Sequence, residues 1–207
     1  MNIAIIGSTR GIGLALVRAA LSDGHTVTAL ARNPDLMPLR DERLRVVAGD
    51  AEDAVAVSKV VEGQDVVCSC LGTRKLFQAV SLFSRAAENL SKALKPEQLL
   101  IAVTGIGTGD SRGHGSALYD HFFLPVILGR MYADKEREEA IIKRSVGRWI
   151  IVRPGFLNDG PRTGRYRALT NLQGIHGGRI SRADVADFVL SQAKDPQFIG
   201  QTPLVIY

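Results

Sequence analysis

The chain has 207 residues, a formal net charge of +5, 45% hydrophobic residues and 23% charged residues. A length below roughly 250 residues fits one domain, and this balance excludes a disordered or fibrous chain, in which apolar residues are scarce. The basic residues are scattered and form no stripe, so the positive charge favours an anionic small ligand over nucleic acid.

Apolar runs and helical patterns alternate along the chain. Runs rich in Val, Ile, Leu and Ala predict strands at Ile3–Ile6, His25–Ala31, Leu44–Ala48, Asp65–Leu71, Leu99–Val103, Arg148–Val152 and Pro203–Ile206. Helices are predicted at about residues 12–22, 53–62, 77–94, 116–145 with an irregularity at Pro125, and 182–193. The charged end of the fourth helix, DKEREEAIIKR, is most simply a solvated face. This alternation of unbroken apolar strands and helices predicts an α/β fold, a Rossmann-type doubly wound parallel sheet.

No internal repeat and no linker rich in Pro, Gly or Ser divides the chain, so residues 1–207 are expected to form a single domain. Residues 154–180 are rich in Gly and Arg and are expected to form a loop region over the ligand crevice, facing the substrate. The N-terminus has no basic region, and the longest other apolar run, residues 122–129, is too short for a membrane span of ~20 residues. We therefore expect a cytoplasmic protein that does not bind membranes.

The two cysteines, Cys68 and Cys70, stand two residues apart in an extended VVCSCL run. They cannot easily bridge each other in this arrangement, so we interpret them as small buried side chains. A zinc site needs about four ligands, and no other spacing in the sequence supplies them. We predict no metal.

The stretch GSTRGIG, residues 7–13, lies between the first predicted strand and the first predicted helix. In this context Gly7 permits a tight turn, Gly11 lets the backbone approach a pyrophosphate, and Gly13 lets the helix pack closely on the strand. The N-terminus of the helix adds free N–H groups and positive potential. We therefore prefer a dinucleotide site to an incidental loop, with contacts from Gly7, Ser8, Thr9, Arg10, Gly11, Ile12 and Gly13.

The end of the second predicted strand indicates which nucleotide binds. NAD-specific sites place Asp or Glu about 20 residues beyond the glycines, whereas this chain has Arg32 followed by Asn33. An arginine suits a 2′-phosphate, and Arg10 can add a second positive charge on the same side. NADP(H) is thus the predicted cofactor; the alternative is that Arg32 is a solvated residue at the start of a loop.

With these residues, the chain resembles the short-chain dehydrogenase/reductase superfamily, and within it the small atypical NAD(P)H-binding members such as flavin/biliverdin reductases and NmrA-like proteins. The resemblance covers nearly the whole chain, in GSTRGIG, LARNP, VVAGDAED, GQDVVCSCLGTR, AVTGIGTGDSRG, DKEREEAIIKRSVGRWIIVRPGFLNDGP and ISRADVADFVL. It implies contacts beside the adenine, after the fourth strand and at the nicotinamide end, by Asp50 and Ala51, then Leu71, Gly72 and Thr73, then Pro154, Gly155, Phe156 and Leu157.

The catalytic pair departs from the superfamily pattern, in which Tyr and Lys lie four residues apart on one helix face. There the ammonium lowers the phenol pKa and the phenol delivers a proton. Here Met131 stands four residues before Lys135, and Tyr132 stands three residues before it. The resemblance still makes Thr104, Tyr132 and Lys135 the candidate catalytic residues, with Thr104 and Lys135 also beside the cofactor. Their alternatives are a turn residue for Thr104 and a solvated helix lysine for Lys135.

Three functions fit these residues. The first is an NADPH-dependent oxidoreductase that transfers a hydride to a small conjugated acceptor, of flavin or quinone type, with no strong tyrosine acid. The second is a carbonyl reductase or epimerase-like enzyme that uses Tyr132 or Tyr119 with Lys135. The third is a non-enzymatic NADP sensor like the NmrA-type regulators. We favour the first, with an anionic or aromatic small-molecule substrate and a monomer or homodimer as the assembly.

Overall fold

A sheet of eight strands runs through the computed structural model, which describes residues 1–73 and 78–207. Its strand order is β3-β2-β1-β4-β5-β6-β10-β8, and its neighbours are parallel except for the antiparallel pair β10 and β8. The strands are β1 (Asn2–Ile6), β2 (Thr26–Ala31), β3 (Leu44–Ala48), β4 (Val66–Ser69), β5 (Leu99–Val103), β6 (Trp149–Pro154), β8 (Arg167–Leu169) and β10 (Leu204–Ile206). A second, small parallel sheet pairs β7 (Phe156–Asn158) with β9 (Arg179–Ser181).

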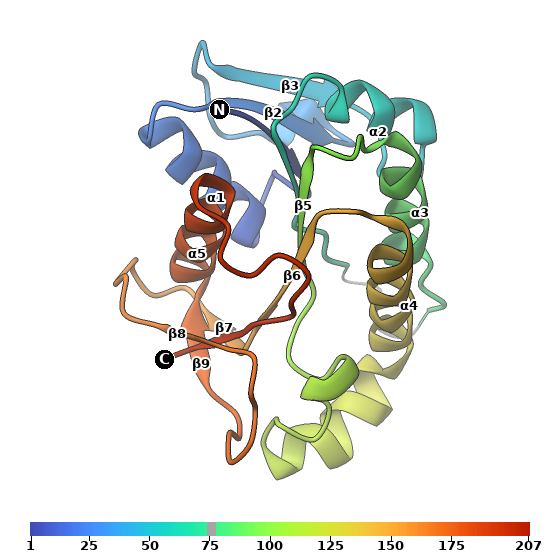
Figure 1. The fold of residues 1–207 in the computed structure, drawn as a ribbon, viewed down its shortest axis with the longest axis vertical. Helices are drawn as coiled ribbons and strands as arrows, with labels where there is room; N and C mark the ends of the chain where they lie inside the picture. Colours follow the sequence, from blue (N-terminus) through green and yellow to red (C-terminus); the bar gives the residue numbers. More distant parts are fainter. Residues whose placement is uncertain (74–77) are drawn as a thin grey trace.

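Helices cover both faces of the large sheet (Figure 1). On one face lie α1 (Gly11–Ser22) and α5 (Arg182–Lys194); on the other lie α2 (Ala54–Val61), α3 (Leu82–Ala93) and α4 (Gly129–Ser145). Alternate side chains of β1 point to opposite faces of the sheet. Ile3 and Ile5 pack in the core under α1 and α5, and Ala4 and Ile6 pack in the core under α2, α3 and α4. The prediction of a doubly wound Rossmann-type fold is confirmed.

All seven predicted strands are present, with shifts of one or two residues at some ends. The third predicted helix begins later than expected, at Leu82, and residue 77 lies outside the described residues. The fourth divides into a π-helical segment, η3 (Tyr119–Leu128), and α4. Pro125 lies inside η3, and the irregularity follows from its missing backbone N–H. Two short 3-10 turns, η1 (Pro34–Leu36) and η2 (Gly109–Ser111), complete the elements.

Two expectations need correction. The segment of residues 154–180 is more than a loop, because it contains β7, β8 and the start of β9, each of three residues. Strands this short carry too few residues for an alternating pattern to be detected. They form here because β8 pairs with β10, and β7 pairs with β9.

The charged end of the fourth predicted helix is solvated only in part, since Arg137, Lys143 and Arg144 are exposed but four other charged residues are buried. In α4, Asp134 is 0% exposed, Lys135 6%, Glu138 2% and Glu139 3%. These groups are buried because α4 packs along α3 and against the sheet. Asp134, Lys135 and Glu139 have hydrogen-bond partners there, such as the backbone N–H of Phe83, which donates to Asp134 at 2.9 Å, whereas Oε2 of Glu138 has none among the described residues. Within residues 1–73 and 78–207, no helix has the length and apolar character needed to cross a membrane.

Candidate functional site

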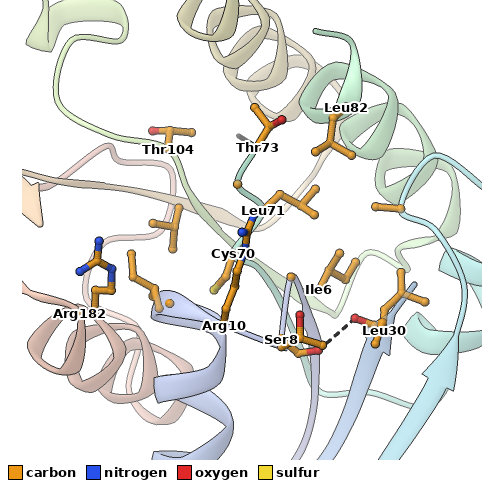
Figure 2. Close-up of a pocket in the computed structure, with 18 of the residues that line it drawn as sticks. Ile6, Ser8, Arg10, Leu30, Cys70, Leu71, Thr73, Leu82, Thr104 and Arg182 are labelled. Atoms are coloured by element: carbon orange, nitrogen blue, oxygen red, sulfur yellow. Dashed lines mark hydrogen bonds between the residues drawn. The ribbon is translucent and has the colours of Figure 1, made fainter. Parts of the chain in front are cut away.

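A cleft of about 630 Å³ opens at the carboxyl ends of the parallel strands (Figure 2). This is the edge where open α/β sheets bind ligands, at the point where the chain order reverses between β1 and β4. Most of the residues predicted for the site line this cleft: Gly7, Ser8, Thr9, Arg10, Gly11, Ile12, Arg32, Asp50, Ala51, Leu71, Gly72, Thr73, Thr104, Tyr132, Lys135, Pro154 and Leu157.

Three other predicted residues lie behind the lining. A Cβ on Gly13 would lie 2.1 Å from the carbonyl oxygen of Gly7, so this glycine lets α1 pack on the turn. A Cβ on Gly155 would lie 2.6 Å from the carbonyl oxygen of Gly178. The ring of Phe156 packs edge-on against Tyr119, with centroids 4.9 Å apart. These positions indicate packing, and a direct cofactor contact by any of the three stays a prediction.

The opening turn has the shape that a phosphate needs. Gly7 and Gly11 have φ values of +82° and +58°, a region that favours glycine, and a Cβ on Gly7 would lie 2.5 Å from the carbonyl oxygen of Cys70. The hydroxyl of Ser8 donates to the carbonyl oxygen of Leu30 at 3.0 Å, which ties the turn to β2 (Figure 2).

The N-terminus of α1 faces the cleft. Its first residue, Gly11, lines the cleft, no described side chain caps this end, and its first turn has no acidic residue. By contrast, α2 and α5 are capped by the side chains of Asp53 and Ser181. Uncapped N–H groups and the positive end of a helix dipole fit a pyrophosphate, so these residues suit a dinucleotide.

Near the ends of β2 and β3, the lining contains the charged residues Arg32 and Asp50 and is partly open to solvent. Arg32 is exposed at the end of β2, followed by the turn in which Asn33 accepts a hydrogen bond from the N–H of Asp35. One carboxylate oxygen of Asp50 accepts from the N–H of Glu52 at 3.0 Å. The guanidinium of Arg32 is thus beside the cleft and accessible to an anion.

On the α4 side, the lining carries buried charge. The ammonium of Lys135 donates to the carbonyl oxygen of Thr104 at 2.8 Å and lies 4.5 Å from the ring centroid of Phe83. Burial lowers the pKa of Lys135, while the carboxylates of Glu138 and Glu139 act to raise it. Burial raises the pKa of Glu138 to about 8. Lys135 is therefore held in place by burial and a backbone carbonyl, which corrects its interpretation as a solvated helix lysine.

The hydroxyl of Thr104 joins a buried ionic network behind the cleft. It donates to Oε1 of Glu139 at 2.9 Å, and Oε2 of Glu139 lies 2.6 Å from Nη2 of the fully buried Arg153. Arg153 also pairs with Asp110, and Glu139 accepts from the hydroxyl of Thr108 at 2.6 Å. Burial opposes ionisation of Glu139, but the hydrogen bond to Arg153 prevails and lowers its pKa. The network anchors the loop after β5 to α4 and β6.

Tyr132 lines the cleft, but its hydroxyl is engaged elsewhere. It lies 2.8 Å from the hydroxyl of Tyr119, which in turn lies 3.2 Å from the carbonyl oxygen of Ile106. Burial raises the pKa of Tyr132. Among the described residues, Tyr132 is thus hydrogen-bonded to Tyr119 and Lys135 to the Thr104 carbonyl, and a catalytic role for either side chain stays a prediction.

The sequence did not identify ten further lining residues. Several lie at strand ends and were within reach of the same reasoning that found their neighbours. Arg182 and Asp159 lie in stretches that carry the family resemblance, but their ion pair of 2.6 Å joins distant segments and was not predicted. The ten are Ile6, Leu30, Ala31, Gly49, Cys70, Leu82, Val103, Met131, Asp159 and Arg182.

Comparison with known proteins identifies a family for most of the chain. A family model described as NAD(P)H-binding matches residues 7–196. Among curated relatives, an uncharacterized protein of Mycobacterium tuberculosis is 37% identical over 75 residues, which are 36% of this chain. The chain matches 8% of that relative's length.

Solved structures share the fold over its full extent. ChuY from Escherichia coli O157:H7, described as an anaerobillin reductase, is 25% identical, with a TM-score of 0.82 over 100% of this chain and 97% of that one. A short-chain dehydrogenase/reductase of the wide type from Veillonella parvula, in complex with NADP, is 16% identical, with a TM-score of 0.78 over 100% of this chain and 94% of that one. At that identity, the second likeness shows the fold alone.

Proposed function

We propose, because the chain belongs to the NAD(P)H-binding family, that it is an NADPH-dependent oxidoreductase whose acceptor is a small conjugated molecule of flavin or quinone type. The observation that carries the proposal is a cleft with a glycine-rich turn at one end and, at the other, a Tyr132 whose hydroxyl accepts a hydrogen bond from Tyr119 and has none to Lys135 among the described residues. The ChuY likeness supports a reductase, since that neighbour is described as one. The bound cofactor would supply a hydride, and a conjugated ring accepts it without a strong acid.

The cofactor side of this proposal rests on charge. The uncapped end of α1 and the turn from Gly7 to Gly13 would hold the pyrophosphate. Arg32 and Arg10, both exposed in the cleft, would bind the 2′-phosphate that distinguishes NADPH from NADH.

At the other end of the cleft, Lys135 would hold the cofactor near the acceptor. An ammonium has three N–H groups, and one of them is bonded to the Thr104 carbonyl, which leaves the others to hold a ribose hydroxyl in the cleft. Residues 154–180 would cover the acceptor, since Leu157 and Asp159 reach the cleft from this segment. The proton that completes reduction would come from water.

An assay of cofactor oxidation tests this function. NADPH absorbance is followed with purified protein and, in turn, FMN, a soluble quinone and a simple ketone. We expect consumption with the conjugated acceptors and little with the ketone. Turnover with the ketone alone would contradict the proposal, and tight NADPH binding without consumption under any condition would favour the sensor.

A carbonyl reductase is the second candidate, because Tyr132 and Lys135 both line the cleft. If Tyr132 donated a proton, Tyr132→Phe would lower turnover by about 10²–10⁴-fold, the usual value of general acid catalysis. We expect a change of only a few-fold, matched by Tyr119→Phe, and a loss in Lys135→Ala that arises mainly from weaker NADPH binding. A hundred-fold loss in Tyr132→Phe with unchanged NADPH affinity would favour the second candidate.

A further inference from the structure

Arg182 lies in the cleft close to the opening turn. It is the first residue of α5, it lines the cleft, and its side chain is 32% exposed. A Cβ on Gly11 would lie 4.0 Å from Cδ of Arg182, so the two helices bring a guanidinium beside the N-terminus of α1 (Figure 2). Nothing in the proposed hydride transfer uses this group.

The place of Arg182 is electrostatically unfavourable in the protein alone. A helix N-terminus carries positive potential, so a cation at the first position of α5 is repelled by its own helix and by the nearby start of α1. Arg10 adds positive charge to the same cleft. The acid in the first turn of α5, Asp184, is fully buried and accepts hydrogen bonds from Thr163 and Gly164. Local costs of this kind are typical of functional sites.

Asp159 provides the ion-pair partner of Arg182 in this structure. Its Oδ1 lies 2.6 Å from Nη1 of Arg182, but the Asp159 side chain is 88% exposed. Water screens such exposed pairs, so the carboxylate can be exchanged for another anion at little cost. Among the described lining residues, basic side chains outnumber acidic ones, which favours an anion: the acidic residues are Asp50 and Asp159, and the basic ones are Arg10, Arg32, Lys135 and Arg182.

We propose that Arg182 binds the pyrophosphate of the dinucleotide, and that Asp159 holds the guanidinium in the cleft until the cofactor displaces it. The inference rests on the proposed function, because it requires a dinucleotide with its pyrophosphate at the start of α1. A guanidinium can bind two phosphate oxygens at once. The pyrophosphate is common to NADPH and NADH, so Arg182 sets the affinity for both cofactors, while Arg32 sets the choice between them.

Equilibrium titrations of NADPH and NADH test the proposal. We expect Arg182→Gln to weaken both cofactors by the same factor, about ten-fold to hundred-fold for a charge-assisted hydrogen bond. The affinities of Arg182→Lys should lie between those of the unmodified protein and of Arg182→Gln, because an ammonium keeps the charge but does not bind two phosphate oxygens at once. Arg32→Ala should instead change the ratio of the two affinities. Arg43→Ala is the matched control, because its exposed ion pair with Asp41 lies outside the cleft lining.

Two fragments and one further variant separate the possible roles. Arg182→Gln should weaken ADP-ribose, which contains the pyrophosphate, and leave 2′-AMP, which lacks it, unchanged. Asp159→Asn should increase the affinity for both dinucleotides, because the guanidinium of Arg182 then has no ion pair with a carboxylate to break. Weaker binding would overturn the role proposed for Asp159. The melting temperature of each variant without cofactor checks the fold.

The inference and the proposed function fail in different ways. Titrations of Arg182→Gln that match those of Arg43→Ala, or a loss confined to NADPH, would overturn the role of Arg182 and leave the proposed function standing. If the unmodified chain bound neither dinucleotide, the proposed function would be overturned and the inference with it.

Discussion

The two ends of the cleft are built in opposite ways. The phosphate end is centred on one continuous stretch, from β1 through the turn to the start of α1. Its charged residues Arg10, from the turn, and Arg32, from the end of β2, are exposed. The α4 end joins segments far apart in the chain, and its charged residues, Lys135 and Glu139 among them, are buried. Water solvates an exposed charge until a ligand binds, whereas a buried charge needs a partner within the protein. Substitutions at the two ends should therefore fail differently, in ligand binding at one and in folding stability at the other.

The largest effect is expected at the phosphate end, for Gly13→Val. A Cβ there would lie 2.1 Å from the carbonyl oxygen of Gly7, so the valine forces α1 away from the turn and misdirects its N–H groups. NADPH binding, measured by titration, should be lost. Gly147→Ala is the control, because a Cβ at Gly147 meets nothing within 4 Å. A folded Gly13→Val protein that bound NADPH normally would show that the stretch is not a phosphate turn.

At the α4 end, Glu139→Gln should lower the free energy of unfolding by about 3 kcal/mol, because it removes the buried carboxylate that pairs with Arg153 and leaves only the exposed Asp110. Urea denaturation measures the loss. Glu136→Gln, on the same helix, removes an exposed partner of Arg112 and should cost less than about 1 kcal/mol. Equal losses in the two variants would contradict the difference between buried and exposed charge on α4.

At the phosphate end, Arg32→Ala should affect ligand binding and leave folding stability nearly unchanged. It should weaken NADPH binding by about 1.5–3 kcal/mol, the value of a hydrogen bond to a charged group, with little effect on NADH. The unfolding free energy should stay within about 0.5 kcal/mol of the unmodified protein, because Arg32 is exposed. If the unmodified protein bound both cofactors equally, a role of Arg32 in choosing NADPH would be untenable.

The smallest effect is expected for Asp110→Asn, which tests the exposed edge of the buried network. The Asp110 side chain is 64% exposed; burial acts to raise its pKa, but the hydrogen bond to Arg153 prevails and lowers it. A lowered carboxyl pKa stabilises the fold above the ordinary value of about 4, and the gain disappears as pH falls through the folded value. The variant should lose at most about 1 kcal/mol at pH 7 and nothing by about pH 2. A loss that persisted at acid pH would point to packing.

The same contrast explains what the sequence could predict. The strand β5 has the predicted bounds, because its unbroken apolar run marks a buried parallel strand. The edge strand β3 also has them, although it contains Arg45 and is only partly buried. The phosphate end was also predictable, since a turn between a strand and a helix is a local pattern. Its contacts with bound cofactor stay predictions.

The α4 end could not be predicted in the same way. The burial of Glu139, in α4, depends on its ion pair with Arg153, in β6. No local sequence pattern predicts a contact between these two elements. Mixed charges on a helix are usually solvated, so DKEREEAIIKR was misinterpreted for a general reason. Arg182 was missed because the packing of α5 beside α1 brings it to the cleft.

The position of β10 has a consequence for the order of folding. In the large sheet, β10 lies between β6 and β8, and β8 is hydrogen-bonded there to β10 alone among the described strands. Residues 167–169 therefore cannot join the sheet until residues 204–206 are in place, and pairings between distant segments form slowly. The phosphate turn, by contrast, needs contacts with β2 and β4 only, which lie early in the chain. Pulse-labelled hydrogen exchange during refolding should protect the amides of β1 and β2 before those of β8 and β10.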